Sequence, residues 1–176
     1  MKKGIRKEVR QRIKELTPEQ MNMAAEAIFS QIEKSNLFDN ATTIALFASM
    51  KDEVPTNVAL ERWLEAGKHI VVPRVEGDVM HFYDYSPEHM RVGAFGILEP
   101  DGEAECPPEE IDLMIVPARA FTRKGERLGR GGGFYDKYMS NSKFRAAKIG
   151  IAFACQIFDS LPCDAHDIRV DKVVTE

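Results

Sequence analysis

A ten-residue stretch from Arg127 to Asp136 carries the residue types of a polyphosphate and metal site, because it contains four glycines, two arginines and a carboxylate. Glycine accepts positive φ and lets backbone amides approach an anion, and arginine presents a planar cationic fork to phosphate oxygens. Residues 134–139 are predicted to begin a helix, whose first turn favours negative charge. Asp136 would lie in that turn, within reach of a magnesium ion carried by the phosphates.

This glycine run matches neither of the common nucleotide fingerprints. A P-loop requires Gly-Lys-Ser/Thr, whereas Gly133 is followed by Phe134 and Tyr135. A dinucleotide motif starting at Gly129 requires glycine at position 134, where the chain has phenylalanine. The alternative is a glycine-rich surface loop or strand-to-helix turn, although solvated linkers are richer in serine and lysine than this run.

The composition describes an ordinary globular chain. Its 176 residues suffice for one hydrophobic core and are few for two. A net charge of −4 argues against a nucleic-acid partner held by bulk positive potential. The three cysteines have no C-x-x-C spacing, and no run is apolar over the length of a membrane span. We therefore expect an unprocessed cytoplasmic protein with no nucleic-acid or membrane partner.

The elements that must position the glycine run follow an α/β pattern. Residues 2–16 are predicted to form a basic amphipathic helix, and the simplest interpretation of its charges is a face exposed to solvent. Thr17, Pro18 and Gln20 predict the capped start of a second helix. Short β-rich runs and one helix follow; the strands are expected at 43–49, 69–74, 79–85, 113–116 and 148–153, and the helix at 55–66. The acidic, proline-containing segment 99–110 is expected to be an exposed loop.

This order predicts an α/β single-domain sandwich over residues 1–176, with a mixed, largely parallel sheet flanked by helices. The N-terminal helices, residues 2–34, would pack on an α/β core formed by residues 42–176. Ligand sites in such sheets lie beyond the carboxyl ends of the strands. Two segments occupy that position in the sequence: Met50 to Glu53 after the first strand, and the glycine run after residues 113–117.

Together with its surroundings, the glycine run resembles the 5-formyltetrahydrofolate cyclo-ligases, also called 5,10-methenyltetrahydrofolate synthetases. The similarity extends over nearly the whole chain and has four anchors: the N-terminal residues 2–6, the turn at 49–54, the run at 127–136 and the ending at 167–171. The third anchor is the most specific. The resemblance implies an ATP-dependent, magnesium-requiring closure of 5-formyltetrahydrofolate to 5,10-methenyltetrahydrofolate, in which the formyl oxygen attacks the γ-phosphate and N10 then adds to the activated carbon.

The resemblance also implies roles for matching positions in this chain. The ATP residues would be Lys2, Lys3, Gly4, Ile5, Arg6, Arg127, Leu128, Gly129, Arg130, Gly131, Gly132, Gly133, Phe134 and Tyr135. The folate residues would be Ala48, Met50, Glu53 and Tyr135, and the magnesium carboxylates would be Asp136 and Asp167. Glu53 would accept hydrogen bonds from the paired donors of the pterin, in a pocket expected to lie away from the glycine run. Without the resemblance, Glu53 reads as a helix-entry acid and Asp167 as an acid of a surface turn.

Two departures from the family pattern concern the glycine run. Some members have lysine where this chain has Gly132, and tyrosine is frequent where it has Phe134. Arg130 is therefore expected to be the central cation and the catalytic residue of the run. The expected partners are ATP, Mg²⁺ and 5-formyltetrahydrofolate, with or without a polyglutamate tail, bound to a monomer. A sugar-phosphate isomerase or transferase-like α/β enzyme, or a non-catalytic nucleotide-binding module, remains the alternative.

Overall fold

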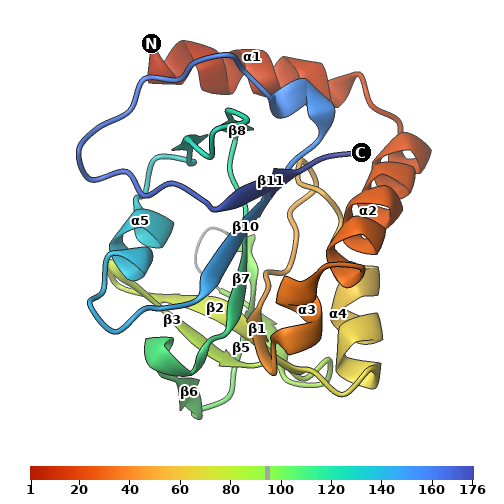
Figure 1. Cartoon of the computed structure of the whole chain (residues 1–176), viewed down its shortest axis with the longest axis vertical. Coiled ribbons are helices and arrows are strands. Elements are labelled where there is room, and N and C mark those ends of the chain that lie inside the picture. The colour runs from red at the N-terminus through yellow and green to blue at the C-terminus, as the bar shows by residue number, and fades with distance from the viewer. Residues whose placement is uncertain (94–95) are drawn as a thin grey trace.

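The computed structural model describes residues 1–93 and 96–176 (Figure 1). Its helices are α1 (Lys2–Lys14), α2 (Pro18–Glu33), α3 (Asn36–Asn40), α4 (Asn57–Glu65) and α5 (Phe134–Met139), with the 3-10 helices η2 (Pro108–Glu110) and η3 (Ala154–Gln156). The strands are β1 (Thr43–Ala45), β2 (His69–Glu76), β3 (Val79–Asp84), β4 (Met90–Val92), β5 (Leu98–Pro100), β6 (Glu105–Cys106), β7 (Leu113–Val116), β8 (Ala120–Phe121), β9 (Arg127–Leu128), β10 (Ala147–Ile151) and β11 (Lys172–Val174).

The described strands form one large sheet and two small ones. The large sheet has seven strands in the order β11-β10-β7-β1-β2-β3-β6. Strands β11, β10, β7, β1 and β2 run parallel, whereas β3 and β6 join antiparallel at one edge. The pairs β4–β5 and β8–β9 form the two small sheets. The predicted mixed, largely parallel sheet is therefore confirmed.

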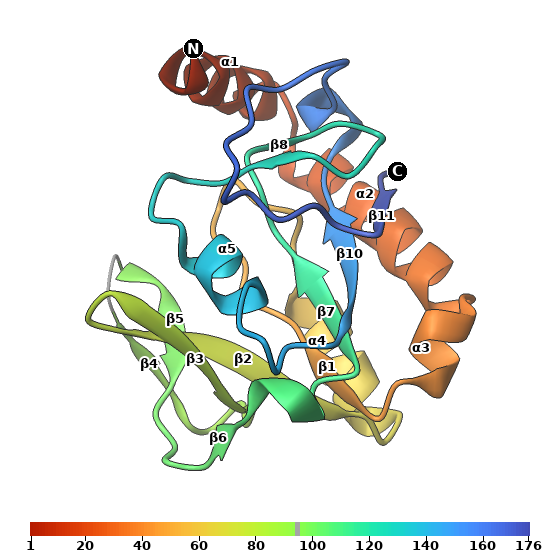
Figure 2. The same ribbon diagram turned by 60° about the vertical axis from the view of Figure 1, so that its left-hand side comes forward.

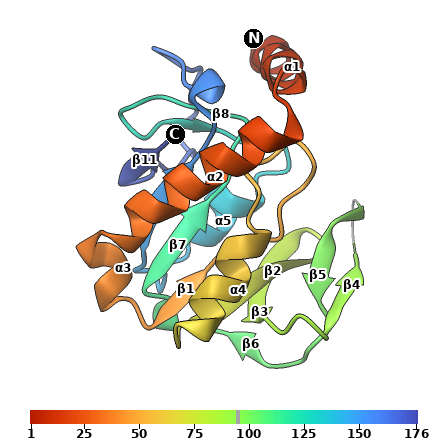
Figure 3. The same ribbon diagram turned by 90° about the vertical axis from the view of Figure 1, so that its right-hand side faces the viewer.

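Helices cover both faces of the large sheet. Helices α2, α3 and α4 lie on one face and α5 on the other (Figures 1 and 3). Side chains alternate between the two faces along each strand: Leu113 and Ile115 of β7 join the core under α2 and α4, whereas Met114 and Val116 join the core under α5. Helix α1 lies beyond the carboxyl ends of the parallel strands, against β8 and η3 (Figure 2).

Apolar spacing and a capping box account for the two N-terminal helices α1 and α2. Val9 and Ile13 of α1 are buried, as the apolar spacing predicts. A capping box begins α2: Gln20 N donates to Thr17 Oγ1 at 3.1 Å, and Thr17 N donates to Gln20 Oε1 at 2.8 Å. None of the described helices is long and apolar enough to cross a membrane.

The expectation of an exposed loop over residues 99–110 is only partly right, because residues 101–105 and Glu110 are exposed but the residues that flank 101–105 are not. The segment includes the end of β5, all of β6 and η2, and the side chains of Glu99 and Cys106 are buried. Glu99 Oε2 accepts a hydrogen bond from Val75 N at 2.9 Å. The negative composition suggested solvation, but this long-range contact to β2 buries Glu99 instead.

The first strand is shorter than predicted, and this brings polar residues to the edge of the sheet. Strand β1 ends at Ala45 instead of residue 49, and the chain then turns at residues 51–53 before α4 begins at Asn57. Thr56 holds this turn: it donates from Oγ1 to Phe47 O at 2.5 Å and exchanges two 3.0 Å hydrogen bonds with Ser49. The turn therefore has a fixed shape beyond the carboxyl end of β1.

Candidate active site

A cavity of about 590 Å³ lies at the carboxyl edge of the parallel strands. Its walls come from α1, the turn after β1, strands β2 and β5, the glycine run with α5, and the segment before β11. All the predicted site residues line it except Lys3, Gly4 and Ile5. The glycine run and the turn after β1, which are far apart in the sequence, therefore face the same space.

The backbone of the glycine run takes conformations that favour glycine. Gly131 has φ 118° and Gly133, the N-cap of α5, has φ 72°, and both lie in the region that residues with a Cβ rarely adopt. A Cβ at Gly132 would lie 2.6 Å from the ring of Phe134. Phe134 thus occupies the space that a side chain at 132 would need. The two departures from the family pattern, Gly132 and Phe134, therefore depend on each other through packing.

Arg127 is buried behind the run, where it orients Asp136. Its side chain is 4% exposed, and its Nη1 lies 2.9 Å from Asp136 Oδ1. Its Nη2 donates to Pro117 O at 3.2 Å. Ile168 N also donates to Asp136 Oδ1, at 3.0 Å. The carboxylate at the start of α5 is thus tied both to β9, with which the run begins, and to the segment that contains Asp167.

Helix α1 brings two cations to the cavity. Arg6 Nε donates to Gly129 O at 2.8 Å. Lys2 Nζ lies 2.7 Å from Asp164 Oδ2 and 3.8 Å from Asp167 Oδ2. Residues four apart share one side of a helix, which explains why Lys2 and Arg6 line the cavity together.

The other predicted ATP residues of α1 lie elsewhere. Lys3 and Gly4 are exposed, and Ile5 packs against the core. Of the anchor at residues 2–6, only Lys2 and Arg6 therefore line the cavity.

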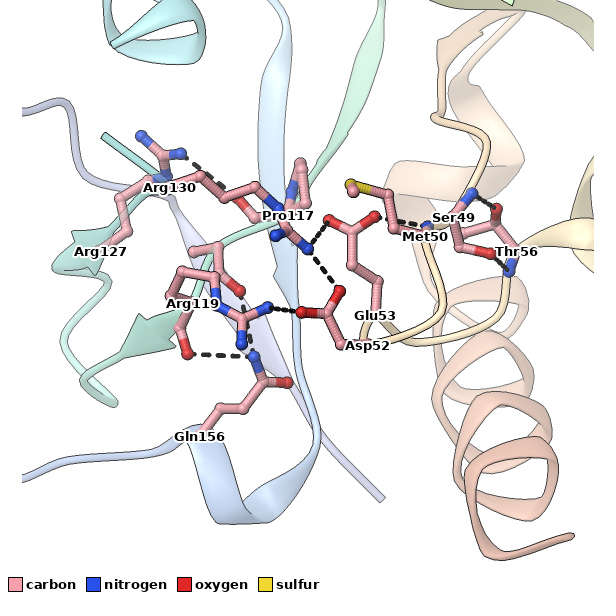
Figure 4. A network of polar contacts seen from close by, with 11 residues as sticks. Ser49, Met50, Asp52, Glu53, Thr56, Pro117, Arg119, Arg127, Arg130 and Gln156 are labelled. Carbon is pink, nitrogen blue, oxygen red and sulfur yellow. Dashed lines mark hydrogen bonds and ion pairs between the residues drawn. The ribbon is translucent and has the colours of Figure 1, made fainter. Parts of the chain in front are cut away.

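Two adjacent carboxylates and two arginines meet at the edge of the cavity, which Glu53 and Arg130 line (Figure 4). Arg130 Nη2 lies 2.7 Å from Asp52 Oδ1 and 3.6 Å from Glu53 Oε2. Arg119 Nη1 lies 2.9 Å from Asp52 Oδ2, and Met50 N donates to Glu53 Oε1 at 2.8 Å. The expectation that Glu53 lies away from the glycine run is wrong, because the turn after β1 folds back toward Arg130.

Burial and charge act in opposite directions on the two carboxylates. Burial raises the pKa of Glu53 above its ordinary value, although the Met50 amide and Arg130 act against it. Burial also acts to raise the pKa of Asp52, but the hydrogen bond and charge of Arg130 and the charge of Arg119 outweigh it and lower the pKa. Asp52 is therefore the strongly ionised partner of the arginines, and Glu53 is the buried acceptor that faces the cavity. Burial likewise raises the pKa of Tyr135, which keeps its hydroxyl protonated.

The carboxylates near α1 have the chemistry of magnesium ligands. Asp136, Asp164 and Asp167 line the cavity, and oxygen atoms are the donors that Mg²⁺ prefers. Among the described residues, no group of three or more His, Cys, Asp or Glu side chains is arranged to hold a metal alone. Magnesium commonly binds through one or two carboxylates together with substrate phosphates, and the residues present fit that mode.

The sequence reasoning missed several residues of this region. Asp52 and Arg119 complete the charge network, Asp164 pairs with Lys2, and Glu99 forms part of the cavity wall. Asp52 and Arg119 could have been found from position, because each follows a buried strand at the carboxyl edge. Glu99 carried no such signal, since its burial depends on the contact with β2.

The fold and cavity place this protein among the α/β enzymes that bind ligands beyond the carboxyl ends of parallel strands. The chain belongs to the 5-formyltetrahydrofolate cyclo-ligase family, whose sequence model matches residues 1–176. This membership decides against the isomerase, transferase and non-catalytic alternatives.

Individual relatives agree over nearly their full lengths. The 5-formyltetrahydrofolate cyclo-ligase of Escherichia coli K12 is 32% identical over 95% of this chain and 96% of its own. The mouse enzyme of the same name is 29% identical over 99% of this chain and 93% of its own. Among solved structures, the 5,10-methenyltetrahydrofolate synthetase of Aquifex aeolicus superposes with a TM-score of 0.87 at 34% identity, covering 98% of this chain and 88% of that one.

Proposed function

We propose that the cavity is the active site in which this chain converts 5-formyltetrahydrofolate to 5,10-methenyltetrahydrofolate, with release of ADP and phosphate from ATP. The observation that carries the proposal is the meeting of two kinds of surface in one cavity. The glycine run with its arginines offers donors for a polyphosphate, and Glu53 offers a buried acceptor for a pterin. Arg130 lies where the two surfaces meet.

The nucleotide side is proposed to hold the triphosphate between α1 and the glycine run. Lys2 and Arg6 approach from α1, and Arg130 approaches from the run. Backbone amides around Gly131 and Gly133 supply further donors, because their positive φ values turn the chain into an anion-binding concavity. Arg127 acts from behind by holding Asp136 in place.

The folate side is proposed to read the pterin through Glu53. Glu53 Oε1 is engaged by the Met50 amide, so Oε2 is the oxygen available to the ring's paired N–H donors. Ala48, Met50 and Tyr135 form the adjoining wall, with apolar residues of β2 and β3. A buried carboxylate surrounded by apolar surface discriminates strongly, because a ligand that lacks the matching donors leaves it unpaired.

The reaction needs charge stabilisation and positioning from the protein. The formyl oxygen forms a bond to the γ-phosphorus while the bond from that phosphorus to ADP breaks. Arg130 is placed to stabilise the charge on the transferred phosphoryl group. N10 then adds to the formyl carbon and loses its proton. The carbon–oxygen bond breaks to release phosphate, which contains the formyl oxygen and takes up one proton in place of the one that N10 lost.

Magnesium is the proposed metal, held by Asp136 and Asp167 with the nucleotide. When bound, it would neutralise phosphate charge during the transfer. The contact of Asp136 with Ile168 N supports this assignment, because it fixes the first carboxylate beside the segment that carries the second.

The chain is further proposed to act as a monomer in the cytoplasm. Its three cysteines are free, which suits a reducing compartment. Gly131, Gly132 and Gly133 line the cavity and are exposed, so the cavity opens to solvent and leaves room for a folate with or without a polyglutamate tail. Sedimentation analysis and a comparison of KM for the two forms of folate test these points.

The test of the function is to incubate the purified protein with ATP, Mg²⁺ and 5-formyltetrahydrofolate. The near-ultraviolet absorbance of the conjugated methenyl product is expected to rise, with one ADP formed for each product molecule. ATP hydrolysis that ignores the folate, or no product at all, would contradict the proposal.

A further inference from the structure

Four of the charged residues labelled in Figure 4 form a network with two charges of each sign: Asp52 and Glu53 are acidic, and Arg119 and Arg130 are basic. Asp52 lies at its centre, because one of its oxygens pairs with each arginine. Asp52 itself is not among the described residues that line the cavity, whereas Glu53 and Arg130 are. Of its two arginine partners, Arg130 lines the cavity and Arg119 is not among the described residues that do.

Arg119 gives Asp52 a fixed anchor. Its side chain is 5% exposed, and its Nη2 is buried without a hydrogen-bond partner. Its backbone is held by Gln156, which donates from Nε2 to Arg119 O at 3.0 Å and to Ala118 O at 3.1 Å. The Oε1 atom of Gln156 accepts from Phe153 N at 2.8 Å. Asp52 is thus tied to a cation whose position is set by the core.

Arg130 lies within 4 Å of two carboxylates, those of Asp52 and Glu53. It takes the bond to Asp52 at 2.7 Å and leaves Glu53 Oε2 at 3.6 Å. Arg130 is 38% exposed and lies on a glycine-rich segment, so only modest movement separates the two partners. Without the Asp52 carboxylate, Glu53 would be the acid nearest to Arg130, and the resulting pair would engage the Glu53 oxygen that Met50 leaves available.

We propose that Asp52 is a positioning residue that, anchored by Arg119, holds Arg130 in a long 3.6 Å contact with Glu53 and keeps the two from closing to a hydrogen-bonded pair. Glu53 then stays available to the pterin, and Arg130 stays available to the phosphoryl group. This inference rests on the proposed function, because it takes Glu53 as the pterin acceptor.

The test measures binding of 5-formyltetrahydrofolate by calorimetry in the absence of ATP. Asp52→Asn frees Arg130 to close its 3.6 Å contact with Glu53 to a hydrogen-bonded pair, and it should raise the folate Kd about tenfold. Arg130→Gln alone should leave the folate Kd near the parent value. The Asp52→Asn/Arg130→Gln double variant should also return to within about twofold of the parent, because no arginine remains to engage Glu53. A merely structural role of Asp52 predicts no such recovery, so a double variant as weak as Asp52→Asn would overturn the proposal.

Asp52→Asn also leaves the buried Arg119 without its carboxylate, which can cost enough stability to prevent folding. Arg119→Gln added to each variant removes that charge, and the same recovery on loss of Arg130 is expected in this background. Asp84→Asn is the matched control, since it removes a surface carboxylate that pairs with His69 far from the cavity network. Its folate Kd should equal that of the parent, and a comparable weakening would show that the effect is not specific to Asp52.

Folate binding by Glu53→Gln distinguishes an error in the proposed folate site from an error in the role proposed for Asp52. If this variant binds folate as tightly as the parent, the proposed folate site is wrong. If it binds weakly but loss of Arg130 does not rescue Asp52→Asn, the folate site stands and only the positioning role of Asp52 fails.

Discussion

Replacement of Glu53 by glutamine is expected to weaken folate binding much more than ATP binding. The structure fixes which end of the new amide faces the ligand. Met50 N donates to the Oε1 position at 2.8 Å, so the amide carbonyl will occupy that side and the amide nitrogen will face the cavity. A donor then opposes the donors of the pterin, in a place where the Glu53 side chain is only 12% exposed.

The magnitude follows from the loss of a buried, charge-supported hydrogen bond. Such a bond contributes about 1.5–3 kcal/mol, which corresponds to a rise in folate Kd of about 10-fold to 150-fold. The ATP Kd should change by no more than about fivefold, because the Arg130–Glu53 contact is long and Arg130 is partly exposed.

Calorimetric titration with each ligand separately measures both effects. A folate Kd within about twofold of the parent would refute the assignment of Glu53. Loss of ATP binding with folate binding intact would move Glu53 to the nucleotide side of the cavity. The thermal unfolding midpoint of the variant serves as the control for folding.

Three further outcomes are expected. Arg130→Lys keeps the charge but loses the planar fork, so kcat should fall by at least about tenfold; a parental kcat would show that a point charge suffices. Asp136→Asn keeps the shape beside the buried Arg127 but removes a proposed metal carboxylate, so half-maximal activity should require at least about tenfold more Mg²⁺ with unchanged folate Kd; an unchanged requirement would assign the metal elsewhere. Burial raises the pKa of Glu53 above its ordinary 4.5, and the pterin needs the ionised carboxylate, so folate affinity should be full above that raised pKa and fall as the pH drops through it. Glu53→Gln should abolish this pH dependence of the folate Kd. If the pH dependence persists in the variant, another group is responsible for it.

Local patterns were sufficient to predict the layers of the fold. The buried strand Leu113–Val116 matched its apolar run, and α2 begins at the capping box of Thr17 and Gln20. The rule for carboxyl edges of parallel sheets also located both candidate segments correctly. The helical periodicity of α1 could also have been used. Lys2 and Arg6 are four residues apart and therefore share one side of the helix, whereas Ile5 packs against the core.

Long-range contacts account for what the sequence did not predict. Glu99 looks solvated in an acidic segment, but its bond to Val75 N buries it. The joining of Glu53 and Arg130 depends on a short β1 and on the Thr56 contacts that fold the turn back. Neither arrangement leaves a periodic pattern in the chain, because each is a contact between residues that are distant in sequence.

In the proposed reaction, the γ-phosphoryl group of ATP is transferred to the formyl oxygen within this cavity. The most direct test uses 5-formyltetrahydrofolate labelled with ¹⁸O in the formyl group, converted in a single turnover with unlabelled ATP in unlabelled water. We expect each phosphate released to carry one ¹⁸O atom, as measured by mass spectrometry. Unlabelled phosphate formed together with the methenyl product would contradict it, because the formyl oxygen would then have left by a route that does not involve ATP.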